Sequence, residues 1–300
     1  MKLIAPLLLI ATAAVAQIND TYIIPAAGNT PGALNTVWAT QFSVFNPQAY
    51  PLKVSVTFVP TPGSGNSDLT EKSITVPANA VAFSDNVLKD LFAMQGQGAL
   101  LVATFPEDNP TVKDDVVSRA FLVTTNTFNN APTGTFGQTV PGVWAGLQDF
   151  STDGISAIAH GIRNGGGFRT NVGAVNLGRS SVTMTLKVYD ANGKPIADNL
   201  PFILPPLAHM QDSLHDQNNV PIPVDRGSIE FFVDDSTKQA VVFPYVSVVD
   251  NHSGDPQYQS PTLLATPSVL FQKAAKIDVA FARKVRASAI RLGEGQLQTQ

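Results

Sequence analysis

The sequence predicts an all-β protein made of two tandem, related antiparallel β-sandwich domains, followed by a C-terminal amphipathic helix. Three observations lead to this prediction. Apolar and polar residues alternate along several short segments, which is typical of strands with one buried face. The 22 Gly and 22 Pro are dispersed along the chain, as turns between many short strands require. The second half of the chain also repeats features of the first half in the same order.

The internal repeat is clearest in one strand-like segment of each half. Thr40-Gln-Phe-Ser-Val-Phe-Asn46 matches Thr170-Asn-Val-Gly-Ala-Val-Asn176, and an aromatic residue lies two positions before each Thr. Four further segments match in order: 74–77 with 202–205, 98–102 with 227–231, 117–121 with 241–245, and the turn-rich 132–137 with 253–256. Five ordered matches predict a duplication, with domains at 20–142 and 155–266 joined by a linker at 143–154.

Composition limits the chemistry available to the chain. It has 300 residues, 44% of them hydrophobic and 14% charged, which is enough for two ordinary globular domains. It contains no cysteine, which excludes disulfides, thiolate zinc sites and cysteine nucleophiles. Stability must therefore come from full-sized apolar cores.

The N-terminus has the features of a secretory signal peptide. Met1-Lys2 supplies a positive charge, Leu3–Ile10 is a short apolar run, and Ala14-Val15-Ala16 is a small-residue cleavage site. We expect cleavage after residue 16 and a secreted, periplasmic or cell-surface protein; the alternative is a retained N-terminal anchor. No later segment is long and apolar enough to predict a transmembrane span.

Two local signals predict elements between the strands. Ser84-Asp85-Asn86 precedes two apolar turns and predicts a short helix over 87–92, with a counterpart at 212–214 in the second half. Asp190-Ala-Asn-Gly-Lys194 lies between two strand-like segments and predicts a hairpin, because Asn-Gly readily adopts positive φ.

The C-terminal segment 267–300 differs from the rest. Its apolar residues fall three or four apart, which predicts an amphipathic helix, and it carries six bases against two acids, whereas residues 17–266 carry 12 bases and 21 acids. Such a helix could contact an acidic surface of a partner or an anionic membrane, or pack on the acidic body of this same chain. Nucleic acid is not an expected partner, because the chain is acidic overall and the basic segment lacks interleaved aromatics.

Three features together resemble uncharacterised secreted bacterial proteins with tandem β-sandwich (immunoglobulin-like) repeats. They are the aromatic-x-Thr-x₅-Asn strand of each half, Gly134-Thr-Phe-Gly-Gln138, and Tyr245-x-Ser-x-Val-Asp-Asn251. The resemblance spans about residues 20–262. It implies a fold class and an extracellular location, and it supplies no catalytic residues.

Motifs of common enzymes are absent from the sequence. There is no Gly-x-Ser-x-Gly, no phosphate-binding Gly-x₄-Gly-Lys-Ser/Thr and no His-Glu-x-x-His. His209 and His215, with Asp212 or Asp216, could hold a metal, or they could be surface residues of a loop. The acidic pairs 114–115 and 234–235 show no sign of a cleft, although glycosidic hydrolysis needs two carboxylates across one.

Calcium is the metal that the sequence favours. Asp250, Asn251 and Asp255 lie in one short Gly-containing segment, and Ca²⁺ prefers such carboxylate and carbonyl oxygens. The alternative is that Asp250 and Asn251 hydrogen-bond their own backbone in Asx turns. Asp190 and Asn192 form a second, weaker candidate.

The sequence therefore predicts a non-enzymatic structural or adhesion module with an unknown partner, such as an extracellular polysaccharide or an envelope protein. The alternative is an extracellular carbohydrate-binding accessory module that could depend on calcium. Trp38 and Trp144 could be sugar-stacking platforms, or core and interdomain residues.

Overall fold

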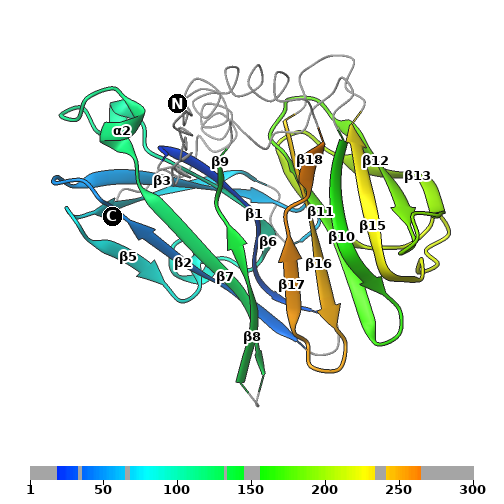
Figure 1. The fold of residues 1–300 in the computed structure, drawn as a ribbon. Helices are drawn as coiled ribbons and strands as arrows, with labels where there is room; N and C mark the ends of the chain where they lie inside the picture. Colours follow the sequence, from blue (N-terminus) through cyan, green and yellow to red (C-terminus); the bar gives the residue numbers. More distant parts are fainter. Residues whose placement is uncertain are drawn as a thin grey trace, which may run out of the picture.

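The computed structural model describes residues 19–32, 36–64, 68–131, 134–144, 156–233 and 241–264. The all-β class is confirmed, because antiparallel strands make up most of the described residues (Figure 1). The signal segment 1–16, most of the linker and the tail 267–300 lie outside the described residues, so the predictions made for them stay predictions. No helix in the described part of the chain is long and apolar enough to cross a membrane.

The first half of the chain forms one nine-stranded sheet with the path β4-β3-β6-β1-β2-β7-β8, to which β5 is added beside β2 and β9 beside β1. Its strands are β1 (Thr21–Pro31), β2 (Val37–Phe45), β3 (Leu52–Pro60), β4 (Thr70–Val76), β5 (Val81–Ser84), β6 (Gly96–Ala103), β7 (Leu122–Ala131), β8 (Gly134–Pro141) and β9 (Val143–Trp144). Two one-turn helices, α1 (Val87–Asp90) and α2 (Val116–Arg119), and a 3-10 turn (Pro106–Asp108) connect them. The first two residues of the expected linker thus lie in a strand, β9.

The second half forms two sheets, β13-β12-β15-β10-β18 and β14-β11-β16-β17. Their strands are β10 (Ser156–Asn164), β11 (Phe168–Asn176), β12 (Val182–Tyr189), β13 (Pro195–Leu204), β14 (Ala208–Ser213), β15 (Val224–Val233), β16 (Val242–Asp250), β17 (Pro256–Gln259) and β18 (Thr262–Leu264). In Figure 1 they lie beside the first half, with β17 next to β8.

Strand pairing repeats between the halves. The pairs β1–β6, β2–β5, β2–β7, β3–β4, β3–β6 and β7–β8 of the first half have the counterparts β10–β15, β11–β14, β11–β16, β12–β13, β12–β15 and β16–β17. One difference merges the sheets of the first half: the end of β1, Asn29–Pro31, also pairs with the start of β2.

Asn46 and Asn176, the last residues of the matched sequence segments, make the same contacts. Each side chain is buried, donates to three backbone carbonyls and accepts from the N–H two residues ahead. Two of the carbonyls belong to equivalent positions, Val76-Pro77 in one half and Leu204-Pro205 in the other. The Asn therefore fixes the turn after its strand to the end of β4 or β13.

Each half has an apolar core, and in the second half both sheets contribute to it. Ile229 and Phe231 from one sheet pack in the same cluster as Val172 and Val246 from the other. The first half has a corresponding cluster around Val56 and its neighbours. Full burial of such side chains stabilises a fold by about 1.5–3 kcal/mol each.

A third apolar cluster joins the halves. Ile23, Val59 and Leu101, on the opposite faces of β1, β3 and β6 from the core, pack with Val175 and Phe243 of β11 and β16. The expected solvent-exposed face of β3 is therefore buried, whereas β12 keeps the expected alternation of buried and more exposed residues. Uninterrupted apolar runs, such as Ala99–Val102 in β6, are the sequence signal for strands buried on both faces.

Local predictions had mixed outcomes. The helix after Asn86 is confirmed, with the Asn86 side chain accepting from Lys89 N–H, and the hairpin at 190–194 is confirmed by the Asp190 N–H to Lys194 carbonyl bond. The prediction of a helical counterpart at 212–214 is wrong, because Asp212 lies in strand β14 and pairs with Val172 of β11.

The match of 117–121 with 241–245 is also wrong in register. Asp115 caps α2 by accepting from Ser118 N–H, so the chain is helical there, and β7 starts only at Leu122. Leu122 pairs with Phe45, and Phe243 pairs with Val175, which is the residue that matches Phe45 in the repeat. Leu122 is therefore the counterpart of Phe243.

Candidate functional site

A polar pocket of about 260 Å³ lies between the two halves. The first half contributes Ala26, Ala27, Gly28, Thr30, Pro31, Gly32, Trp38, Gln97, Thr127 and Gln138, and the second half contributes Arg169, Asn171, His209, Gln211, Tyr245, Ser247 and Val249. Because strands of both halves form its walls, the pocket depends on how the halves pack together.

The wall from the second half is the outer face of the sheet β14-β11-β16-β17. Period-two alternation places Arg169, Asn171, Gly173 and Val175 of β11 on this face. Their direct partners on β16, in the same order, are Val249, Ser247, Tyr245 and Phe243. The face is thus apolar at its Val175–Phe243 end, which packs on the first half, and becomes more polar toward Arg169, where it lines the pocket.

The opposite wall includes Trp38 and Gln138. The Trp38 ring is half-buried, and its Nε1 donates to Thr36 Oγ1 at 2.9 Å, which holds the ring in place. Ser247 Oγ donates across the pocket to Gln138 Oε1 at 3.0 Å. Trp38 is therefore not a core residue; it lines the candidate site. The side chain of Trp144 lies outside the described part of the structure.

A chain of hydrogen bonds runs along the buried side of the pocket. His209 Nδ1 contacts Thr61 Oγ1, and its Nε2 is 2.8 Å from Tyr245 Oη, which donates to Gln211 Oε1 at 2.8 Å. Complete burial lowers the pKa of His209 to about 3, so the imidazole is neutral and carries one N–H. The Tyr245 hydroxyl donates its hydrogen bond to Gln211, so toward His209 it acts as an acceptor. His209 therefore donates from Nε2 and accepts from the Thr61 hydroxyl at Nδ1.

The aromatic rings of this chain are stacked. The Tyr245 ring lies 5.9 Å from that of His209 and 5.5 Å from that of Tyr258, with small interplanar angles. Burial raises the pKa of both tyrosines, so neither phenol ionises near neutral pH. The expectation that His209 lies on a loop surface is wrong, because β14 carries it into the contact between the halves.

Arg169 is the cation of the pocket lining. Its Nη1 donates to Asn251 Oδ1 at 2.5 Å, and no carboxylate of the described residues pairs with it. Partial burial lowers its pKa from the usual value, which for Arg still leaves it charged. By contrast, Arg163 on the preceding strand is paired with Asp225 at 3.3 Å.

The predicted calcium residues lie together in the turn between β16 and β17, but they have protein partners. Asp250 Oδ1 accepts from His252 N–H at 2.8 Å, an Asx turn, and this bond lowers the pKa of Asp250. Asn251 is occupied by Arg169, and Asp255 contributes a backbone carbonyl to Asp250 N–H. Asp190, the weaker candidate, likewise accepts from the N–H groups of Asn192 and Lys194.

The other metal candidates are separated in space. His215 Nε2 lies 3.1 Å from Asp212 Oδ2 on the exposed side of the turn after β14, whereas His209 is buried between the halves. In the described ranges, no three His, Asp or Glu side chains come together as a metal site. Calcium at Asp250, Asn251 and Asp255 stays a prediction.

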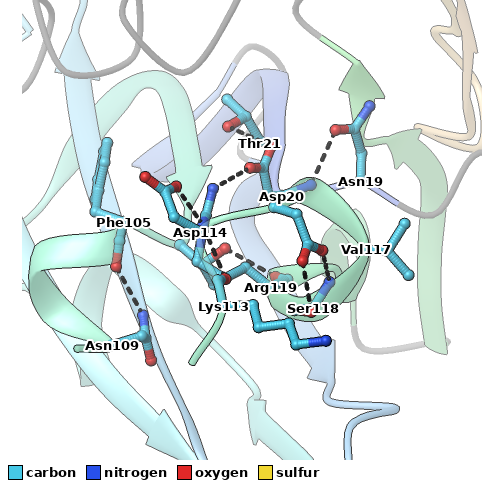
Figure 2. A network of polar contacts seen from close by, with 12 residues as sticks. Asn19, Asp20, Thr21, Phe105, Asn109, Lys113, Asp114, Val117, Ser118 and Arg119 are labelled. Carbon is cyan, nitrogen blue, oxygen red and sulfur yellow. Dashed lines mark hydrogen bonds and ion pairs between the residues drawn. The ribbon is translucent and has the colours of Figure 1, made fainter. Parts of the chain in front are cut away.

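The acidic pair 114–115 belongs to a structural network around Arg119 (Figure 2). The fully buried guanidinium pairs with Asp20 at 3.1 Å and with Asp114 at 2.8 Å, while Asp115 caps α2. The network ties the N-terminal segment, which enters β1, to α2 and the loop before it. The pair 234–235 lies outside the described residues.

Sequence reasoning missed Arg169, Asn171, Gln211 and Ser247. The available signal was the alternation Arg169-x-Asn171-x-Gly173, which places two polar residues and a glycine on one strand face. Nothing in the sequence indicated that this face would meet the other half of the chain.

Comparisons with known proteins do not show a family. No family model and no curated protein matches the chain. Among solved structures, it is similar to the isomalto-dextranase of Arthrobacter globiformis T6 in complex with panose, at 12% identity and a TM-score of 0.27. That match covers 74% of this chain and 39% of the isomalto-dextranase chain, so the chain spans well under half of that enzyme.

Proposed function

We propose that this chain is a secreted, non-enzymatic binding module, built from two tandem immunoglobulin-like β-sandwich repeats, that holds a polar ligand in the pocket between them. Attachment to an extracellular polysaccharide or envelope component through this pocket would serve adhesion or scaffolding. The observation that carries the proposal is the pocket itself, a concave polar site whose two walls come from different repeats.

The lining suits a hydroxyl-rich ligand. Amide and hydroxyl groups of Asn171, Gln211, Gln138 and Ser247 line it, together with the half-buried ring of Trp38. Carbohydrates present hydroxyls at their edges and apolar C–H faces, which need this combination of polar groups and an aromatic ring. The Asn171 side chain has no hydrogen-bond partner in the described structure and is available to a ligand.

The absence of a suitable acid–base pair supports a non-enzymatic role. None of the described lining residues is Asp or Glu, whereas glycosidic hydrolysis uses two carboxyl groups. His209, with its pKa of about 3 and both nitrogens engaged, is a poor proton carrier near neutral pH. Tyr245 stays protonated because burial raises its pKa.

The arrangement as two sandwich repeats rests on the repeated strand pairing and on the apolar cluster that each half contains. Secretion rests on the N-terminal sequence, and a protein recovered from the medium should begin at Gln17. The basic segment 267–300 is proposed to be a helix that contacts an acidic surface, of this chain or of a partner.

The test is thermal unfolding of the purified protein with a panel of mono-, oligo- and polysaccharides, in calcium and in chelator. A ligand that binds only the native state raises the free energy of unfolding by about 2.7 kcal/mol at a hundredfold excess over Kd. We expect a higher Tm with at least one saccharide and a fluorescence change from Trp38. Asn171→Ala should remove the shift, and Gln257→Ala, which removes an exposed amide outside the pocket, should keep it.

Unchanged Tm with every saccharide would reject the pocket as a carbohydrate site. Turnover of a saccharide by the purified protein, lost on substitution of a pocket residue, would reject the non-enzymatic role. A saccharide shift seen in calcium and abolished by chelator would support the predicted calcium site at Asp250, Asn251 and Asp255.

A further inference from the structure

The charge of the pocket is opposite to that of the chain. The whole sequence carries a net charge of −4, yet the described lining contains no carboxylate. His209 and Tyr245 are neutral, for the reasons given above, so Arg169 alone sets the charge of the lining at +1. A single charge in a concave site with low-dielectric walls has a stronger field than the same charge on an open surface.

The position of Arg169 is suited to a ligand carboxylate. It follows the first residue of β11, and its side chain is half-buried beside Asn171 and Ser247 at the polar end of the sheet face. Asn251 accepts from Nη1 and so orients the guanidinium without neutralising it. A planar guanidinium with free N–H groups matches a carboxylate in bidentate geometry.

Most other described basic side chains that are buried or half-buried have a carboxylate partner, whereas exposed ones such as Lys113 and Arg179 have none in the described structure. Arg119 is paired with two carboxylates, Arg163 with Asp225, Lys53 with Asp108, and Lys187 with Asp198. An arginine that is half-buried in a pocket and lacks a carboxylate partner leaves part of its hydrogen-bonding capacity unused, and a bound anion would satisfy it.

We propose that the ligand is an acidic saccharide, whose carboxylate binds Arg169 and whose hydroxyls bind the amides of Asn171, Gln211 and Gln138. This inference rests on the proposed binding function and specifies its ligand class. The volume of about 260 Å³ is close to the lower limit of roughly 300 Å³ for small-molecule pockets, so the site accommodates about one sugar unit, free or at the end of a chain.

The experiment compares matched sugars that differ in one carboxylate. Binding of glucuronate, galacturonate, glucose, galactose and acetate to the purified protein is measured by titration calorimetry at low and high salt. We expect a uronate to bind about tenfold or more tightly than the neutral sugar with the same ring, since hydrogen bonds to charged groups are the stronger ones. Salt should weaken uronate binding and leave neutral-sugar binding unchanged.

Three variants assign the preference to Arg169. Arg169→Gln should abolish the preference for the uronate, and Arg169→Lys should retain part of it, since it keeps the charge without the planar fork. Arg179→Gln removes the same charge from an exposed position outside the pocket and should change nothing. The Tm of each variant without ligand confirms folding.

The outcomes separate this inference from the proposed function. Equal affinity for neutral and acidic sugars, or a uronate preference that survives in Arg169→Gln, would overturn the acidic ligand and leave the pocket as a carbohydrate site. Acetate binding as tightly as the uronates would overturn the saccharide part of the inference. No binding of any sugar would overturn both the inference and the proposed function.

Discussion

The phenol ring of Tyr245 lies directly over the Cα of Gly173, its partner across β11 and β16. A side chain at position 173 would occupy the space of the ring edge and hydroxyl of Tyr245. Because that space is free, the ring lies against the sheet, where its hydroxyl reaches both His209 and Gln211. Gly173 is thus needed for the close approach of the ring.

Gly173→Ala should therefore destabilise the protein by about 1–3 kcal/mol, as overpacking of a tight core does, and displace the Tyr245 hydroxyl from His209. Chemical denaturation measures the loss. Gly28→Ala is the matched control, because a Cβ there would have ordinary contacts of 3.8 and 3.9 Å in an equivalent strand setting. Equal stability of the two variants would contradict the role assigned to Gly173.

His209 should make stability depend on pH. Its pKa is about 3 in the folded protein and 6.5 in the unfolded chain, so between these values the unfolded state binds more protons. Stability contributed by the neutral imidazole is therefore complete above pH 6.5 and is lost as pH falls, by up to about 5 kcal/mol near pH 3. Urea unfolding at pH 7, 6 and 5 measures the slope before most carboxylates titrate.

The control for this slope is His209→Gln, which keeps polar atoms near Thr61 and Tyr245 and cannot take up a proton. It should be less stable than the wild type at pH 7 and lose less stability at pH 5. His215 has the opposite effect, since the Asp216 carbonyl and Asp212 raise its pKa and favour the folded state at low pH. Parallel pH profiles of wild type and His209→Gln would contradict the buried neutral imidazole.

Three features could be predicted from the sequence: the strand content, the hairpin at Asp190–Lys194, and the repeated Asn46 and Asn176 positions. Each has a signal in the order of residues itself, namely alternation, turn chemistry and duplication. The pocket does not, because it depends on which outer sheet faces meet. That contact is set by apolar side chains far apart in the chain, such as Ile23 and Phe243.

The error at Val117–Phe121 has a similar cause. Its alternation resembles a strand, but the Asp115 cap and the buried Arg119 ion pairs stabilise a helical turn instead.

The residues of the predicted calcium segment lie together in one turn. The sequence could not reveal that Asp250 and Asn251 have hydrogen-bond partners within the protein there.

The two carboxylates on Arg119 should differ greatly in their contribution to stability (Figure 2). The Asp20 side chain is 4% exposed and that of Asp114 is 69% exposed. Asp20→Asn leaves a buried guanidinium short of a counter-charge and should cost about 3–5 kcal/mol. Asp114→Asn removes a solvent-screened partner and should cost about 1 kcal/mol or less.

Denaturant unfolding of both variants at pH 7 measures this difference. Burial raises the pKa of Asp20, and its ion pair with Arg119 opposes that rise. Similar losses for the two variants would mean that Arg119 does not depend on the buried partner more than on the exposed one.

The repeated Asn side chains allow a test of whether the two halves unfold together. Asn46→Ala and Asn176→Ala each leave buried backbone groups unpaired at equivalent turns, and each should cost about 2–4 kcal/mol. The halves share an apolar cluster and the Ser247–Gln138 bond, so loss of one half exposes apolar surface of the other.

Calorimetry should therefore show one transition for the wild type, and both Asn variants should lower its Tm by similar amounts while the transition stays single. If the halves were independent, there would be two transitions, and each variant would shift only the transition of its own half. The distinction bears on the pocket, because its walls come from both halves. If the halves unfold together, a ligand bound there raises the Tm of the whole protein. If they unfold independently, the ligand joins two units that can each unfold alone.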